Sequence, residues 1–341
     1  MSSIREARAH FRAARDWHAA GHRVAWLTLV DVKGSAYRRP GAKMVMASNG
    51  RMQGTLSGGC LEGDLYLHAE KAWENGTPSL HQYDLTEDEM WGLGIGCKGQ
   101  VTIWIEPMNP TDPFWQAFGQ ALETDAPLVW GGELPQGLRY FGRPTEGWTL
   151  SGDGEWGVTP EALMGQGAIG RQETRWWDVM RPPERLIVAG AGHDAKPVVA
   201  LAYQAGFDVV VLDPREHVNT DRDFPHAEHW LKSASDLTPD MVRESFWVIM
   251  NHHQRRDEET LKLASQSQPK FLGVLGPRAR TEEMLAKTGV DGASLPLHSP
   301  VGLDLGAESP EEVAVSIVGE LIAARQGRTG GSLNGRERIH A

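Results

Sequence analysis

The chain has 341 residues, which exceeds one average domain and favours two. Its 34 Lys and Arg against 45 Asp and Glu give a formal net charge of −11, which argues against nucleic acid or an anionic membrane as a general partner, because both need concentrated positive surface. Neither a secretory signal nor a stretch of roughly 20 apolar residues occurs, so we expect a cytoplasmic protein.

The first hundred residues predict an α+β arrangement. Apolar residues at helical spacing precede Gly21, and Asn49-Gly50 is typical of a hairpin between two short strands. In chain order the pattern predicts a helix over 4–20, strands over 24–32, 43–47 and 51–56, a helix over 61–73 and a strand over 100–106.

Residues 110–183 give weaker signals, because Pro, Gly and Trp are frequent there. Short runs such as 128–130 predict small strands in a connecting region. We interpret its tryptophans as hydrophobic anchors rather than ligand contacts.

The last part of the chain alternates strands with helices, which predicts a parallel sheet covered on both faces. Ser309, Pro310 and Glu312 form a capping box that predicts the start of the last helix. The fold class is therefore α/β, with an N-terminal α+β domain and a C-terminal Rossmann-like domain with a parallel sheet. The expected ranges are 1–109, a connecting region 110–183, the Rossmann-like domain 184–326 and a flexible tail 327–341.

A glycine turn opens this second domain. The run Gly190-Ala191-Gly192-His193-Asp194-Ala195 matches G-x-G-x-x-G/A directly after a strand and before a helix. Such a turn brings backbone amides and the positive end of the helix close to a phosphate. Asp213 ends the next strand, where an acid accepts hydrogen bonds from ribose hydroxyls. His193 contacts the ligand or caps the loop, and the sequence favours neither.

Two further polar clusters follow strands of this sheet, 251–257 and 276–280. In parallel sheets ligands bind at the carboxyl ends of the strands, so we expect ligand contacts or a polar network here, with His252 as one candidate. Adjacent His252 and His253 do not suit one structural zinc ion. Arg278 and Arg280 either bind phosphate or form a solvated helix start.

Both cysteines lie in glycine-rich turns. Ser57-Gly58-Gly59-Cys60 places one thiol at the start of a helix, whose dipole stabilises a thiolate, and its glycines allow amides to turn toward an anion. Glu62 opposes anion binding unless it points away. Cys97 lies in a second such turn, beside Lys98. The alternative is that both are buried structural cysteines.

A third loop gathers Arg38, Arg39 and Lys43 beside glycines. Three cations in an acidic chain indicate an anionic ligand or a partner surface, or simply a solvated loop.

Taken in order, these motifs resemble the XdhC/CoxI family, whose members mature molybdenum hydroxylases such as xanthine dehydrogenase and carbon monoxide dehydrogenase. The matching runs are Gly34-Ser35, 39–43, 57–62, the turn at Cys97, 105–107, 190–193, 251–253, 275–278 and 299–307.

The resemblance implies a chaperone that binds the molybdenum cofactor, molybdopterin or its nucleotide form, protects it during sulfuration by a cysteine desulfurase, and passes it to the apo-enzyme. The leading hypothesis is a chaperone without turnover of its own, with room for a homodimer, and the charge of the chain argues against a nucleic acid or membrane partner. Cys60 and Cys97 become candidates for holding the cofactor, with Cys60 as the contact to molybdenum or sulfur. Lys98 departs from the small residue expected there. The runner-up is an NAD(P)-dependent oxidoreductase that uses the Rossmann-like domain.

Overall fold

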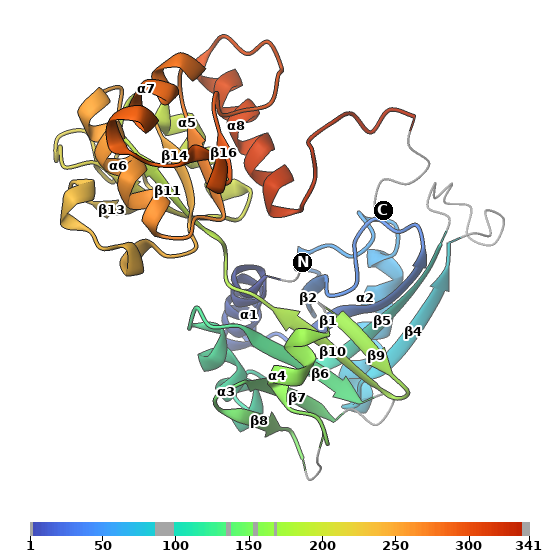
Figure 1. Ribbon diagram of the computed structural model, residues 1–341. Helices are drawn as coiled ribbons and strands as arrows, with labels where there is room; N and C mark the ends of the chain where they lie inside the picture. The colour runs from blue at the N-terminus through green and yellow to red at the C-terminus, as the bar shows by residue number, and fades with distance from the viewer. Residues whose placement is uncertain (1–2, 86–98, 134–137, 153–155, 167–168, 336–341) are drawn as a thin grey trace. The chain divides into compact units, whose positions relative to one another are not determined.

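A computed structural model describes residues 3–85, 99–133, 138–152, 156–166 and 169–335 of the chain (Figure 1). Contacts divide the chain into two compact units, Met1–Pro182 and Pro183–Ala341, each with its own core. Among the described helices, none is long and apolar enough to cross a membrane.

The first unit opens with a five-stranded antiparallel sheet in the order β3-β2-β1-β5-β4. The central strand β1 is apolar along most of its length because both of its faces are buried, with Trp26 in one core and Leu27 in the other. Helix α2 packs on the side of Leu27, and α1 and α3 pack on the side of Trp26. The elements are α1 (Ile4–Ala19), β1 (Val24–Gly34), β2 (Lys43–Ala47), β3 (Met52–Gly54), α2 (Glu62–Asn75), β4 (Ser79–Asp84), β5 (Gly99–Met108) and α3 (Pro113–Leu122).

A second antiparallel sheet belongs to the same unit, in the order β8-β7-β6-β10-β9. Its core is shared with the first sheet: Trp130 and Trp176 are fully buried, and the Trp130 ring lies 6.5 Å from that of Trp26. The interpretation of these tryptophans as hydrophobic anchors is confirmed. The elements are β6 (Leu128–Glu133), β7 (Arg139–Arg143), β8 (Gly147–Leu150), α4 (Pro160–Gly165), β9 (Ile169–Gln172) and β10 (Arg175–Met180).

Two glycines in this sheet explain why its strands are weak in the sequence. A Cβ on Gly131 would lie 2.3 Å from the Trp176 carbonyl oxygen, and one on Gly170 would lie 2.1 Å from the Trp177 ring. Glycine lowers strand propensity, yet only glycine leaves room for the neighbouring chain and the indole rings.

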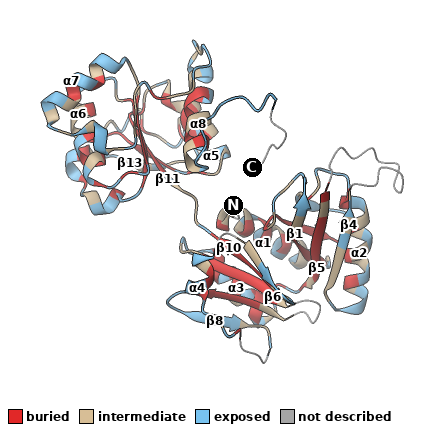
Figure 2. Cartoon of the chain, turned by 45° about the vertical axis from the view of Figure 1, so that its right-hand side comes forward, coloured by how far each residue is buried: buried red, intermediate tan, exposed pale blue. Residues whose placement is uncertain are grey.

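The second unit is a doubly wound parallel sheet in the order β13-β12-β11-β14-β15-β16, the strand order of a Rossmann fold. Helices α5 and α8 cover one face, and α6 and α7 cover the other. The strands are buried between them (Figure 2). The elements are β11 (Arg185–Ala189), α5 (Ala195–Gln204), β12 (Asp208–Leu212), β13 (Glu228–Trp230), η1 (Ala234–Asp236), η2 (Pro239–Val242), β14 (Phe246–Ile249), α6 (Gln254–Gln266), β15 (Phe271–Val274), α7 (Arg278–Thr288), η3 (Gly292–Ser294), β16 (Leu297–His298) and α8 (Pro310–Arg325).

The predicted fold class is confirmed in both halves. Most predicted elements agree within two residues, and the capping box at Ser309 is formed, with the Glu312 amide donating to its hydroxyl at 3.2 Å. The short strands β4, β13 and β16 were missed. The predicted domain borders after residues 109, 183 and 326 stay predictions.

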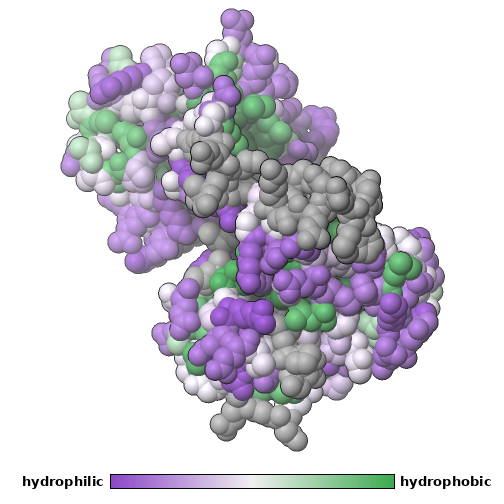
Figure 3. All heavy atoms as spheres, turned by 90° about the vertical axis from the view of Figure 1, so that its right-hand side faces the viewer, coloured by the Kyte–Doolittle hydropathy of each residue, from purple (hydrophilic) through white to green (hydrophobic). Residues whose placement is uncertain are grey.

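On the face drawn in Figure 3, hydrophobic residues form separate patches among hydrophilic ones. Single exposed hydrophobic side chains are ordinary on a protein surface. One of them, Tyr37, is 58% exposed and lies at a small pocket.

Candidate functional site

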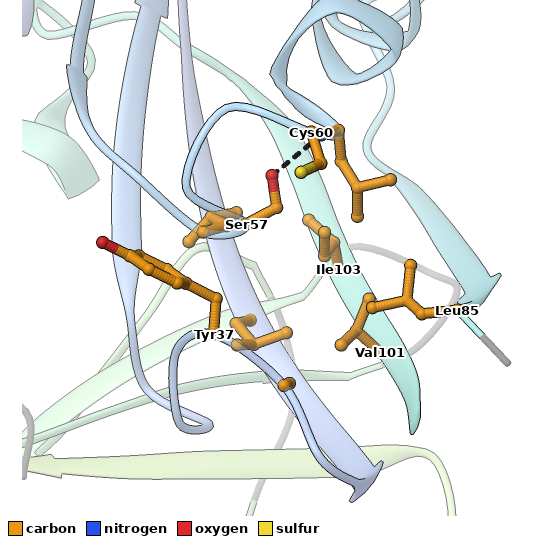
Figure 4. A pocket seen from close by; sticks show the side chains of 10 residues that line it. Tyr37, Ser57, Cys60, Leu85, Val101 and Ile103 are labelled. Carbon is orange, nitrogen blue, oxygen red and sulfur yellow. Dashed lines mark hydrogen bonds between the residues drawn. The ribbon is translucent and has the colours of Figure 1, made fainter. Parts of the chain in front are cut away.

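Cys60 is exposed and lies at the edge of a small pocket of the first unit (Figure 4). The loop between β3 and α2 supplies Cys60 and Ser57, and strand β5 supplies Val101 and Ile103. Most of the lining is apolar: Leu29, Ala36, Tyr37, Leu56, Ser57, Cys60, Leu61, Leu85, Val101 and Ile103. A thiol on an apolar pocket differs from a buried structural cysteine, so the structural alternative is wrong for Cys60.

The loop that carries Cys60 is held by Glu62, the first residue of α2. Its Oε1 accepts hydrogen bonds from the Leu56 and Ser57 amides at 3.1 Å each and from the Thr55 hydroxyl at 2.7 Å. Its Oε2 accepts from the Gly59 amide at 2.9 Å and from the Ser57 hydroxyl. Burial raises the pKa of Glu62, but these hydrogen bonds outweigh it and lower the pKa to about 2.

The anion of this loop is therefore the protein's own carboxylate. The Glu62 side chain points toward the loop. The Gly59 N–H donates a hydrogen bond to its carboxylate, and the Gly58 N–H donates one to the Thr55 hydroxyl at 2.9 Å. The expectation that these two glycine amides turn toward an external anion is corrected. Both glycines have positive φ, +77° and +110°, which the turn requires. Their part in holding a cofactor stays a prediction, as does that of Ser57.

Tyr37 lies beside the same loop. Its ring is close enough that a Cβ on Gly58 would approach it to 3.2 Å. The glycine thus lets an exposed aromatic ring rest against the cysteine loop, on the side of Ser57 (Figure 4). Sequence reasoning did not single out Tyr37.

The three cations of the third loop do not form one site. Lys43 is buried and donates to the Gly41 carbonyl at 2.8 Å and to Asp178 on β10. Arg38 pairs with Glu6 at 2.9 Å, and Arg39 is exposed. The anionic-ligand interpretation of this loop is wrong for Lys43, whose charge is satisfied inside the unit.

Cys97, the second candidate thiol, lies outside the described residues, as does Lys98. Within the residues that the structure describes, no group of three or more His, Cys, Asp or Glu is placed to hold a metal ion.

In the second unit, Gly190 starts the turn after β11. Its φ is +119°, and a Cβ there would lie 2.5 Å from the Met250 carbonyl oxygen at the end of β14. Gly192 passes equally close to a side chain, since its Cβ would lie 2.5 Å from Oδ1 of Asp194. Gly190 is therefore required by its positive φ and by the close backbone, whereas the close approach of Gly192 to a phosphate stays a prediction.

Asp213 follows β12, as predicted, but its carboxylate is already engaged. It is fully buried and accepts from the Ala191 amide at 2.9 Å, from the Arg215 amide at 2.9 Å and from the Arg215 guanidinium at 2.6 Å. Burial raises its pKa, but the Arg215 side chain and these amides outweigh burial and lower it. The expected ribose-accepting carboxylate is therefore a structural anchor of the glycine turn in this structure.

His252 and His193 have different surroundings. His252 has a positive φ of +53° and its Nε2 lies 2.6 Å from Oδ2 of Asp194, so it joins the glycine turn to the loop after β14. His193 is exposed at the turn. Arg278 is also exposed and pairs with Glu282 one turn along α7 at 2.9 Å, which fits the solvated helix start.

Arg280, by contrast, points back to the sheet and pairs with the buried carboxylate of Asp257, which also accepts from the Asn251 amide at 3.1 Å. The structure thus gathers Gly190, Gly192, Asp213 and His252 at the carboxyl ends of the parallel strands, and leaves Arg278 on the helix surface. Arg215 and Arg256 lie against Asp213. Arg256 belongs to the predicted polar cluster 251–257 but was not singled out, and Arg215 was not predicted; its place two residues after Asp213 is the signal that could have found it.

These features define a two-unit protein with a cysteine loop on an antiparallel sheet and a Rossmann unit. Residues 186–321 match the XdhC Rossmann domain, and residues 17–84 match the XdhC and CoxI family. The chain belongs to the XdhC and CoxI family, as the motifs indicated.

Similar proteins agree with this membership. The chain is 30% identical to a probable xanthine dehydrogenase subunit of Bacillus subtilis over 321 residues, which cover 88% of this chain and 92% of that protein. It is 25% identical to the molybdenum cofactor insertion chaperone PaoD of Escherichia coli, across 90% of this chain and 85% of PaoD. A crystal structure described as a xanthine dehydrogenase from Bacillus halodurans superposes with a TM-score of 0.78 at 29% identity, covering 98% of both chains.

Proposed function

We propose that the protein is a molybdenum cofactor-binding maturation factor for molybdenum hydroxylases, and that Cys60 contacts the cofactor. The observation that carries the proposal is an exposed thiol at the edge of an apolar pocket, on a loop whose shape is fixed by internal hydrogen bonds. The names of two similar proteins, a xanthine dehydrogenase subunit and a molybdenum cofactor insertion chaperone, support the same role.

The chemistry of the pocket suits this cargo. A thiolate is a soft ligand and matches a metal centre that is already rich in sulfur. The exposed Tyr37 ring beside the loop would contact the flat pterin part, because heteroaromatic rings stack on aromatic side chains.

The partners follow from this role. We propose an apo molybdenum hydroxylase as the recipient and a cysteine desulfurase as the source of the terminal sulfur. An NAD(P)-dependent oxidoreductase is the alternative. The Asp213 carboxylate is occupied by Arg215 and the Ala191 amide, which counts against NAD as its cofactor but not against NADP.

Binding of molybdopterin to the full chain tests the proposal. The Cys60→Ser variant is compared with Met52→Leu, which removes another exposed sulfur of the same unit, 39% exposed, outside the pocket lining. We expect Cys60→Ser to lose at least tenfold in affinity, about 1.4 kcal/mol, and Met52→Leu to bind as the wild type does. Equal affinity of all three proteins would remove the thiol from the site.

A further inference from the structure

Two arginines meet at the buried carboxylate of Asp213. Arg215 Nη2 lies 2.6 Å from Oδ2, and Arg256 Nη1 lies 3.8 Å from Oδ1. The Asp213 side chain is 0% exposed, whereas those of Arg215 and Arg256 are 38% and 34% exposed. The acid is thus hidden, and both guanidinium groups reach solvent.

The strand order determines which part of the sheet edge the Arg256 side chain crosses. Arg256 lies in α6, which follows β14, and Asp213 follows β12. Strand β11 lies between these two strands. The Arg256 side chain must therefore cross the carboxyl end of β11, where the turn at Gly190 begins and where ligands of Rossmann folds bind.

The standard contact to a ribose diol is not offered by this edge. In Rossmann folds an acidic side chain usually accepts from the ribose hydroxyls, but Asp213 already accepts from two amides and from the Arg215 side chain. What faces solvent instead is a set of guanidinium N–H donors, whose planar fork matches a phosphate group.

The local charge favours an anion. One carboxylate lies between two guanidinium groups, so this cluster has an excess of one positive charge. Asp257 is paired with Arg280, and Asp194 is hydrogen-bonded to His252, which offsets the charge of Asp194 only when its imidazole is protonated. The excess is notable in a chain whose formal net charge is −11.

We propose that Arg215 and Arg256 form a subsite for a phosphomonoester at the carboxyl edge of the Rossmann unit. A phosphomonoester dianion bridges the two guanidinium groups above the buried Asp213, which holds Arg215 in place. The subsite recognises the phosphate group of the ligand, and it does not bind an unmodified ribose diol. This inference does not depend on the proposed function of Cys60.

Equilibrium binding to the full-length protein, followed by calorimetry, tests the subsite. NADP⁺ and NAD⁺ differ by one phosphomonoester, and we expect NADP⁺ to bind at least tenfold more tightly. Phenyl phosphate and 2′-AMP distinguish the source: similar affinity for both identifies a general phosphomonoester site, and binding of 2′-AMP alone identifies a phosphorylated nucleoside. Either result supports the subsite.

Arg256→Gln is the test variant, and Arg222→Gln, at a side chain that is 87% exposed, is the matched control. We expect Arg256→Gln to abolish the preference for NADP⁺, Arg256→Lys to restore part of it, and Arg222→Gln to leave it unchanged. Thermal unfolding without ligand checks the fold; if Arg256→Gln fails to fold, the wild-type preference decides. Equal binding of NADP⁺ and NAD⁺, or none of either at millimolar concentration, would overturn the proposal, as would an unchanged preference in a folded Arg256→Gln protein.

Discussion

A single carboxylate shapes the loop that presents Cys60. The Glu62 carboxylate accepts hydrogen bonds from three backbone amides and two hydroxyls of the segment just before it. It therefore takes the position that an external anion would have in a glycine nest. The loop is therefore preformed, and the thiol is positioned without a ligand. We infer that affinity for a cargo gains from this order, because no loop has to be fixed on binding.

Replacing Glu62 by Gln should destabilise the first unit by about 2 kcal/mol at pH 7, because a charged acceptor of several hydrogen bonds is lost. The pKa of Glu62 is lowered to about 2, below its ordinary value of 4.5, so its contribution is complete above roughly pH 5 and is lost as the pH falls toward 2. Urea unfolding of the wild type and of Glu62→Gln at pH 7 and at pH 3 measures the loss of unfolding free energy and its dependence on pH.

Glu74→Gln, at an exposed position of the same helix α2, serves as the control and should change the free energy of unfolding by less than about 0.5 kcal/mol. A Glu62→Gln protein as stable as this control at pH 7 would show that the hydrogen bonds to the carboxylate do not hold the loop.

The edge strand β4 is attached to α2 by a pair of stacked histidines. The rings of His68 and His81 lie 3.6 Å apart between centroids, and the Tyr83 hydroxyl donates to Asp64 at 2.6 Å. Burial, followed by the charge of His68, lowers the pKa of His81 to about 4. The folded unit therefore keeps His81 neutral where an unfolded chain binds a proton.

This predicts that β4 loosens in acid. Between about pH 6.5 and pH 4 the unfolded chain gains a proton at His81 that the folded chain does not, so local stability falls as the pH falls. Amide exchange of residues 79–84, corrected for the intrinsic rate, should quicken over this range. His81→Phe keeps a ring for the stack and should reduce the pH dependence, while the exposed control His217→Phe should not. Exchange without pH dependence in the wild type would contradict the account.

At the same scale, the sequence predicted those elements whose signals are local. The strand before Gly190 and the helix start at Ser309 depend on neighbouring residues alone, and both are confirmed. The strand β4 was missed because His81 and Tyr83 pack on α2 instead of following a simple apolar alternation. Likewise, the arginine pairing of Asp213 joins residues whose contacts depend on the tertiary fold, so the motif alone could not show that the acid is occupied.

Across the whole first unit, a buried ion pair ties its two sheets together. Lys43 of β2 and Asp178 of β10 pair with side chains 2% and 1% exposed. A buried pair is costly to break because the remaining charge is left without a partner in an apolar core.

Lys43→Met alone should therefore lose about 3–5 kcal/mol of unfolding free energy, and the double variant Lys43→Met with Asp178→Leu should recover most of it. Breaking the exposed pair of Arg12 and Glu123 by Arg12→Met should cost less than about 1 kcal/mol. Chemical denaturation of the four proteins gives the values. A double variant no more stable than Lys43→Met alone would rule out the ion pair as the tie between the sheets.

The central claim for the molecule is that the Cys60 thiol touches the cargo. The most direct measurement is the rate at which iodoacetamide alkylates Cys60, read by peptide mass spectrometry, with and without bound molybdopterin. Because the free thiol is exposed, we predict rapid alkylation without cofactor and at least tenfold slower alkylation with it. Alkylation of Cys60 at the same rate in both states, with the cofactor still bound, would contradict the account.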